Sequence, residues 1–148
     1  MEYLGVITLD SDLGTVEKGL AKFQTRLPTQ LFYKGENFLV GLKELHLPLA
    51  EVVKGTTKRT IFIKSDVVQY NLHGNRFEQL LRVISLPEKA SERATFQFIR
   101  PNYFPLYSNF VDRITIQITD GADLPINLEK GRIIALLEVI KIENERFL

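Results

Sequence analysis

The sequence predicts an all-β fold made of two packed antiparallel sheets. Apolar and polar residues alternate with a period of two along most of the 148-residue chain, and turn residues interrupt the alternation at short intervals. Ten Phe and five Tyr also favour a sheet-rich core. Because the chain contains no linker, internal repeat or low-complexity tract, we expect residues 1–148 to form one domain.

Four strands are expected in the first half of the chain, at residues 3–9, 21–33, 38–47 and 60–68. Pro28 interrupts the second of them, which implies a bend or an edge position because proline cannot donate to a sheet. Residues 34–37 are predicted to form a tight turn, Pro48 to end the third strand, and residues 54–58 to form a loop.

Four more strands are expected at residues 80–86, 94–99, 113–119 and 132–142. The third of these is the clearest, since Ile114, Ile116 and Ile118 share one face. The last is apolar almost throughout, which indicates burial on both faces or a central place in a sheet.

Two other segments complete the second half of the chain. Asn75, followed by Glu78 three positions later, predicts a capped helical turn at residues 76–81. The charged residues 88–93 are predicted to form a solvated loop.

The tally is eight or nine strands joined by connections of unequal length. Unequal connections favour a single Greek-key jelly roll, a β-sandwich of about eight strands, over a simple meander. An immunoglobulin-like sandwich is the alternative that the strand pattern leaves open.

The amino-acid composition argues against several classes of function. Nineteen Lys and Arg against 18 Asp and Glu give a net charge of +1, so nucleic-acid contact is not expected. The absence of Cys excludes disulfides and thiolate chemistry. Residues 1–5 lack the features of a signal peptide, and no apolar run approaches the ~20 residues of a membrane span.

The chain is predicted not to be an enzyme, with no catalytic, cofactor-binding or metal-binding residues. His46 and His73 are the only histidines, and both are interpreted as structural because a metal site needs more ligands. That count also argues against a cupin-like metal enzyme, the third alternative. No serine lies in a nucleophile elbow, and no glycine-rich loop opens a helix.

Two motifs are candidate binding sites. Asp120 and Asp123 flank an Asp-Gly sequence, which predicts a turn; a calcium site is the alternative. The aromatic segment from Tyr103 to Tyr107 is predicted to close the end of the core, with one tyrosine left as an exposed contact. A jelly-roll lectin or adhesion module that uses either motif is the alternative function.

Several blocks of sequence carry a resemblance to known proteins: LFYKGENFLVGLKELHLP at residues 31–48, IKSDVV at 63–68, LLRV at 80–83, YFPL at 103–106, ITIQITD at 114–120, Pro125-Ile126 and the strand at 131–139. Taken in order, these blocks resemble penton-type minor capsid proteins of Polinton/Maverick and adintovirus-like elements.

The resemblance implies a single jelly roll that forms homopentamers at the fivefold vertices of an icosahedral virion capsid. A larger double jelly-roll major capsid protein would be its partner, and the protein would be made in the host cell without a signal peptide. Residues 1–12 and 143–148 are hypothesised to act as arms onto neighbouring capsid proteins.

Overall fold

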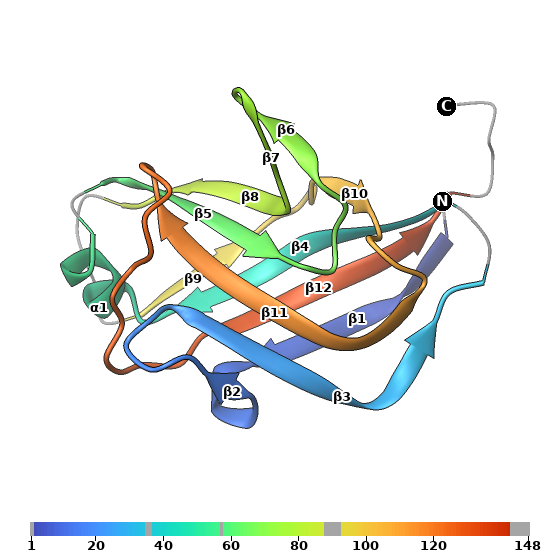
Figure 1. Cartoon of the computed structure of the whole chain (residues 1–148), viewed down its shortest axis with the longest axis horizontal. Helices are drawn as coiled ribbons and strands as arrows, with labels where there is room; N and C mark the ends of the chain where they lie inside the picture. The colour runs from blue at the N-terminus through green and yellow to red at the C-terminus, as the bar shows by residue number, and fades with distance from the viewer. Residues whose placement is uncertain (1, 35–36, 57, 88–92, 143–148) are drawn as a thin grey trace.

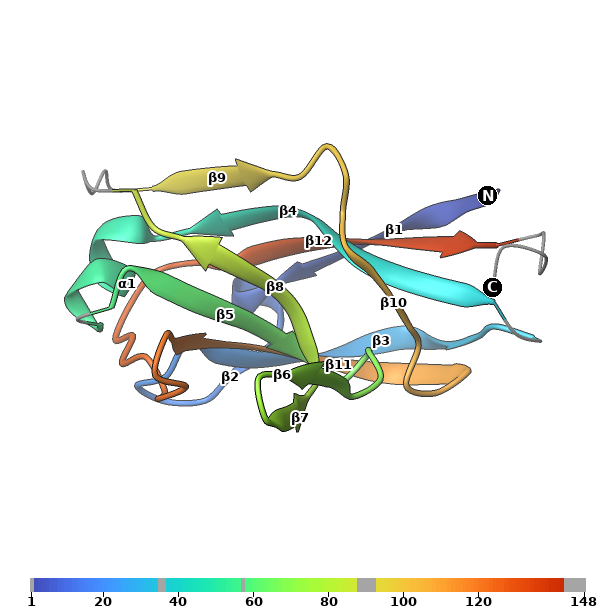
Figure 2. The same ribbon diagram turned by 90° about the horizontal axis from the view of Figure 1, so that it is seen from above.

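The computed structural model describes residues 2–34, 37–56, 58–87 and 93–142. Residues 35–36 of the turn predicted at 34–37, most of the charged loop at 88–93 and the C-terminal arm at 143–148 lie outside these residues. The described chain folds into two stacked antiparallel sheets, seen as two layers in Figure 2.

The first sheet, sheet A, contains the first and last strands side by side. Its order is β1 (Glu2–Asp10), β12 (Ile134–Lys141) and β4 (Phe38–Leu47), and the free side of β4 pairs with both β9 (Ala94–Gln97) and β10 (Tyr103–Pro105). The predicted central place of the last strand is confirmed, because β12 is hydrogen-bonded to β1 on one side and to β4 on the other.

The second sheet, sheet B, packs across sheet A. Its order is β2 (Thr15–Val16), β3 (Lys22–Phe32), β11 (Phe110–Asp120), β5 (Thr60–Ser65) and β8 (Leu80–Ser85). A separate two-stranded ribbon, β6 (Asn71–His73) with β7 (Arg76–Glu78), projects from the end of β5 (Figure 1).

The connections make the sandwich a jelly roll. The chain passes from sheet A to sheet B and back as it forms β1, β3, β4 and β5, and crosses again between β8 and β9, between β10 and β11, and between β11 and β12. The last strand therefore lies between the first and β4, whereas an immunoglobulin sandwich keeps its first strand in the opposite sheet. The predicted jelly roll is confirmed.

The hydrophobic core lies between the two sheets and is formed by the alternate residues of each strand that point inward. Ile114, Ile116 and Ile118 of β11 are fully buried, as the period-two pattern predicts. They belong to the same buried cluster as the inward-facing Leu42 of β4 and Leu137 of β12. Each fully buried aliphatic side chain contributes about 1.5–3 kcal/mol relative to exposure, so this cluster is the main source of stability.

The predicted helical turn at residues 76–81 is wrong. Residues 76–78 form β7, which pairs with β6 through a two-residue turn made by Gly74 and Asn75. Gly74 has a φ of +63°, which favours a hairpin turn with glycine at its first central position. A short helix, α1 (Leu49–Lys54), forms instead directly after Pro48, where the sequence analysis expected none.

Residues 27–30 form the bend that Pro28 predicts. Leu31 pairs with Val111 and Arg26 pairs with Arg113, so four residues of β3 lie opposite Asp112 alone. Figure 1 shows the resulting curvature of β3. This irregularity leaves the proline without a ladder position that would need its missing amide hydrogen.

The proposed N-terminal arm is also wrong for the described residues. Residues 2–10 form β1 and pair with β12 from Lys141 to Ile134. Leu9 is fully buried, and the guanidinium of Arg132 binds both carboxylate oxygens of Asp10. A segment that supplies an edge strand and a core residue is not available as a free arm.

Candidate interaction surface

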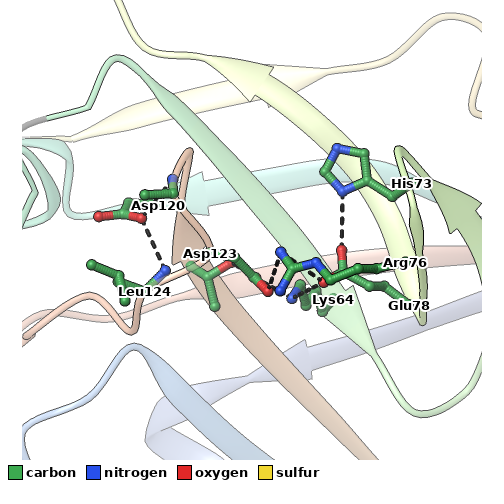
Figure 3. A network of polar contacts seen from close by, with 9 residues as sticks. Lys64, His73, Arg76, Glu78, Asp120, Asp123 and Leu124 are labelled. Atoms are coloured by element: carbon green, nitrogen blue, oxygen red, sulfur yellow. Dashed lines mark hydrogen bonds and ion pairs between the residues drawn. The ribbon is translucent and has the colours of Figure 1, made fainter.

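A network of charged side chains holds the β6–β7 hairpin against sheet B (Figure 3). Lys64 of β5 binds the Glu78 carboxylate of β7 at 3.2 Å and also pairs with Asp123 in the turn after β11. Arg76 binds Asp123 at 2.9 Å, and His73 Nδ1 lies 3.0 Å from Glu78 Oε2. We call these five residues the hairpin clamp.

The two acids of the clamp are largely removed from water. Their side chains are 10% exposed for Glu78 and 12% for Asp123. Burial alone raises the pKa of Asp123, but hydrogen bonds donated by Lys64 and Thr119 outweigh it, so this pKa lies below its ordinary value of 3.8. The clamp is thus a set of mutually compensating charges that ties three elements together.

The structure favours the turn interpretation of Asp120 and Asp123 over the calcium site. Asp120 accepts hydrogen bonds from the backbone amides of Ala122, at 2.9 Å, and Leu124, at 3.0 Å. Asp123 has a φ of +62° and directs its carboxylate to Lys64 and Arg76 (Figure 3). Both carboxylates therefore meet donors from the protein itself.

The two histidines lie on different sides of the sandwich. His46 faces outward from sheet A, 3.0 Å from the Thr95 hydroxyl and 3.2 Å from a Glu44 carboxylate oxygen, whereas His73 belongs to the clamp beside sheet B. Nowhere in the described part of the chain do three His, Asp or Glu side chains gather as a metal site would require.

The aromatic segment divides as the sequence predicts. Phe104 packs against the core and Leu106 is buried. The Tyr103 hydroxyl donates to Glu138 at 3.0 Å on the outer side of sheet A, where Lys43 also binds Glu138 at 3.0 Å. Tyr107 is 60% exposed. The predicted closure of the core and the single exposed tyrosine are both confirmed.

Large apolar side chains gather on the sheet B side of the molecule. We call six of these side chains, each more than half exposed, the aromatic face: Phe32, Tyr70, Leu72, Phe77, Tyr107 and Phe110.

The members of the aromatic face contact one another in two pairs. Phe32 and Phe110 stack across β3 and β11 with ring centroids 4.4 Å apart. Tyr70 and Tyr107 meet edge to face at 6.1 Å. Contacts of this kind stabilise aromatic pairs by about 0.5–1.5 kcal/mol beyond the area that they bury.

Two hollows lie on the aromatic face. The larger, about 740 Å³, lies beside the hairpin and is lined by Phe77 and by Gln117 of β11. The smaller, about 340 Å³, is lined by Tyr107 and Phe110. Tyr70 lines both hollows, so the aromatic residues of the hairpin and those at the end of sheet B belong to one continuous surface.

The exposure of Phe110 is not predictable from the alternation of residues in its strand. Ile114, Ile116 and Ile118 point inward, so strict alternation places Phe110 on the same inner face. The register shift between Val111 and Arg113 reverses the phase, with Val111 buried and Phe110 56% exposed. Phe32 was detectable, because alternation from the buried Phe23 places it outside.

Comparisons with known proteins identify the fold. No family model and no curated protein matches the chain. Among solved structures, the mavirus penton protein superposes with a TM-score of 0.61, covering 93% of this chain and all of that one, at 10% sequence identity. The chain has the fold of that penton protein. At such low identity the likeness is one of fold.

The resemblance to penton-type proteins drawn from the sequence is thus confirmed for the fold. The glycine of Val40-Gly41-Leu42, in the block at residues 31–48, has a structural reason, because Gly41 lies under the connection between β9 and β10. A Cβ there would be 2.8 Å from the Asn102 carbonyl oxygen and 3.0 Å from Pro101 Cβ.

Among the described residues, no helix has the length and apolar character that a membrane span requires.

Proposed function

We propose that the protein is a structural capsid subunit of the penton type, which forms homopentamers at the fivefold vertices of an icosahedral shell. One observation carries the proposal: the jelly roll matches the mavirus penton protein over 93% of this chain and 100% of that one. Its partner in the shell is a double jelly-roll major capsid protein, and its location is the virion.

We propose that the protein acts by assembly and not by catalysis. In this proposal, residues 1–148 act as one domain. A fivefold ring is built from head-to-tail contacts, in which one side of each subunit meets a different side of its neighbour, and the rotation closes after five copies. The two outer sides of this sandwich differ in composition, since the aromatic face lies on the sheet B side. That difference suits a head-to-tail contact.

The mass of the purified protein in solution, measured by light scattering with negative-stain images of the same sample, tests this proposal. We expect particles of about five times the 17.0 kDa chain mass that appear as fivefold rings. A stable trimer would contradict the penton assignment and favour a spike or adhesion module.

Co-expression with a double jelly-roll major capsid protein tests the vertex placement separately. We expect the subunit to purify with assembled shells and to occupy their vertices in averaged images. Shells that close normally while the subunit stays in the soluble fraction would argue against a capsid role.

A further inference from the structure

We propose that the aromatic face is the contact between neighbouring subunits of the ring, and that a second copy of this chain covers it. This inference rests on the proposed function and adds to it the surface by which the copies meet.

The exposed apolar area matches what a subunit contact needs. The six side chains of the aromatic face are between 55% and 71% exposed. Side chains of this size present roughly 200 Å² each when fully exposed, so the face offers about 700 Å², close to the ~800 Å² that each partner buries in a stable interface.

The face is held rigid before any partner arrives. The hairpin that carries Leu72 and Phe77 is tied to sheet B by the hairpin clamp, and Phe32 and Phe110 stack on two neighbouring strands. Little conformational entropy then remains to be lost on association, which favours a specific contact. The hollows on either side of Tyr70 can receive protruding side chains of the neighbour.

A second copy accounts for the position of the face better than a small ligand does. The aromatic face combines residues of the β6–β7 hairpin with residues near the paired ends of β3 and β11, and its side chains line both hollows and not just one. The opposite outer side, formed by sheet A, has different apolar residues, with Ile99 98% exposed. A head-to-tail ring needs two such unlike sides on each subunit.

Substitution of two aromatic residues tests the contact. Phe110→Ser and Tyr70→Ser change side chains that are 56% and 58% exposed, so both variants are expected to fold with nearly wild-type circular dichroism and thermal midpoint. Each is expected to raise the dissociation constant between subunits at least roughly tenfold, because aromatic residues dominate interface energetics. Leu13→Ser, at an 81% exposed leucine outside both hollows, is the matched control and is expected to leave the rings intact.

Mixing wild-type protein with a variant that combines Phe110→Ser and Tyr70→Ser tests the head-to-tail geometry. A variant subunit keeps its other side, so it is expected to bind the open aromatic face of wild-type subunits and to stop the ring from closing. An equimolar mixture should therefore contain fewer rings than the wild-type protein alone at half the concentration. An unchanged number of rings would overturn a head-to-tail contact through this face.

A photo-crosslinking amino acid in place of Phe110 identifies the occupant directly. We expect crosslinks to a second copy of the chain in purified protein and in assembled shells. If both serine variants form rings as readily as the wild type does, this inference is overturned, and the penton proposal still stands. The assignment of a second copy as occupant would be overturned if the wild-type protein stayed monomeric and Phe110 crosslinked only to the major capsid protein or to an added glycan. In that case, incorporation of the protein at the vertices of shells would test the penton proposal independently.

Discussion

Glu138 is a carboxylate of the central strand β12 that points outward from sheet A and is nevertheless 7% exposed. Tyr103 and Lys43 donate hydrogen bonds to it. Burial, together with the adjacent Glu138 carboxylate, raises the pKa of Tyr103 to about 12. Since this value is above the usual 10.0, the tyrosine contributes stability that is complete below pH 10 and is lost as the pH rises towards 12.

Tyr103→Phe is expected to destabilise the protein by about 1–3 kcal/mol at neutral pH, because it leaves a buried carboxylate without one of its donors. Urea unfolding followed by circular dichroism measures the change. Tyr107→Phe is the control, at a ring 60% exposed, and is expected to change stability by less than about 0.5 kcal/mol. Equal effects of the two substitutions would contradict the role assigned to Tyr103.

Asp10 links the end of the first strand to Arg132, just before the last strand. The hydrogen bond from Arg132 lowers the pKa of Asp10 from its ordinary 3.8. The unfolded chain therefore binds this proton at a higher pH than the folded chain does, so acidification through the folded pKa favours unfolding.

Asp10→Asn tests this linkage. The variant is expected to have a lower thermal midpoint than the wild type at pH 7. The difference should begin to shrink below about pH 4, where the carboxylate of the unfolded chain takes up its proton, and should be lost as the pH falls through the lower pKa of the folded chain. Thermal unfolding across that range measures it. A difference that stays constant with pH would exclude the ion pair as its cause.

The β6–β7 hairpin depends on charges from outside its own sequence. Lys64 is 17% exposed and lies between Glu78 and Asp123. Its removal leaves two largely buried carboxylates that repel each other, so the clamp is expected to open before the core does.

Lys64→Met is expected to cost about 2–4 kcal/mol and to speed hydrogen exchange at the amides of β6 and β7 more than at those of β11. Lys54→Met removes a comparable ion pair to Glu51, but one whose lysine is 73% exposed, and is expected to cost less than about 0.5 kcal/mol. Uniform exchange changes across the sandwich would contradict a local clamp.

Gly41 allows the connection between β9 and β10 to cross closely over β4. Gly41→Ala places a methyl group 2.8 Å from the Asn102 carbonyl oxygen, and the strain is expected to cost about 1–3 kcal/mol in denaturant unfolding. Gly121→Ala, where the nearest atom would be 3.2 Å away, is the control and is expected to cost less. The reverse order would show that the crossing adapts easily.

The strands, the β6–β7 hairpin and the hairpin clamp differ in how far they can be predicted from the sequence. The alternating isoleucines of β11 and the apolar run of β12 indicate their strands directly, because burial imposes the pattern. The Asn75 and Glu78 pair suits a helix cap as well as a hairpin, and only the positive φ of Gly74 separates the two. The clamp combines Lys64, Glu78 and Asp123, and no local spacing indicates that residues so far apart in the chain meet.

The sandwich as a unit has a net charge of only +1 and an aromatic side, so its association is expected to depend little on salt. Ring mass measured by light scattering should stay nearly constant from about 0.05 M to about 1 M NaCl, because screening affects charges and not apolar contacts. Dissociation at high salt would indicate that ion pairs, not the aromatic face, hold the copies together.

The position of β12 between β1 and β4 has a consequence for biosynthesis. Until residues 134–141 have left the ribosome, β1 has no strand to pair with and one edge of β4 is open. Sheet B likewise waits for β11, which joins β3 to β5. Folding of the sandwich must therefore wait until residues 134–141 have been synthesised and is expected to be slow. Nascent chains then expose strand edges that chaperones can bind before any subunit can assemble.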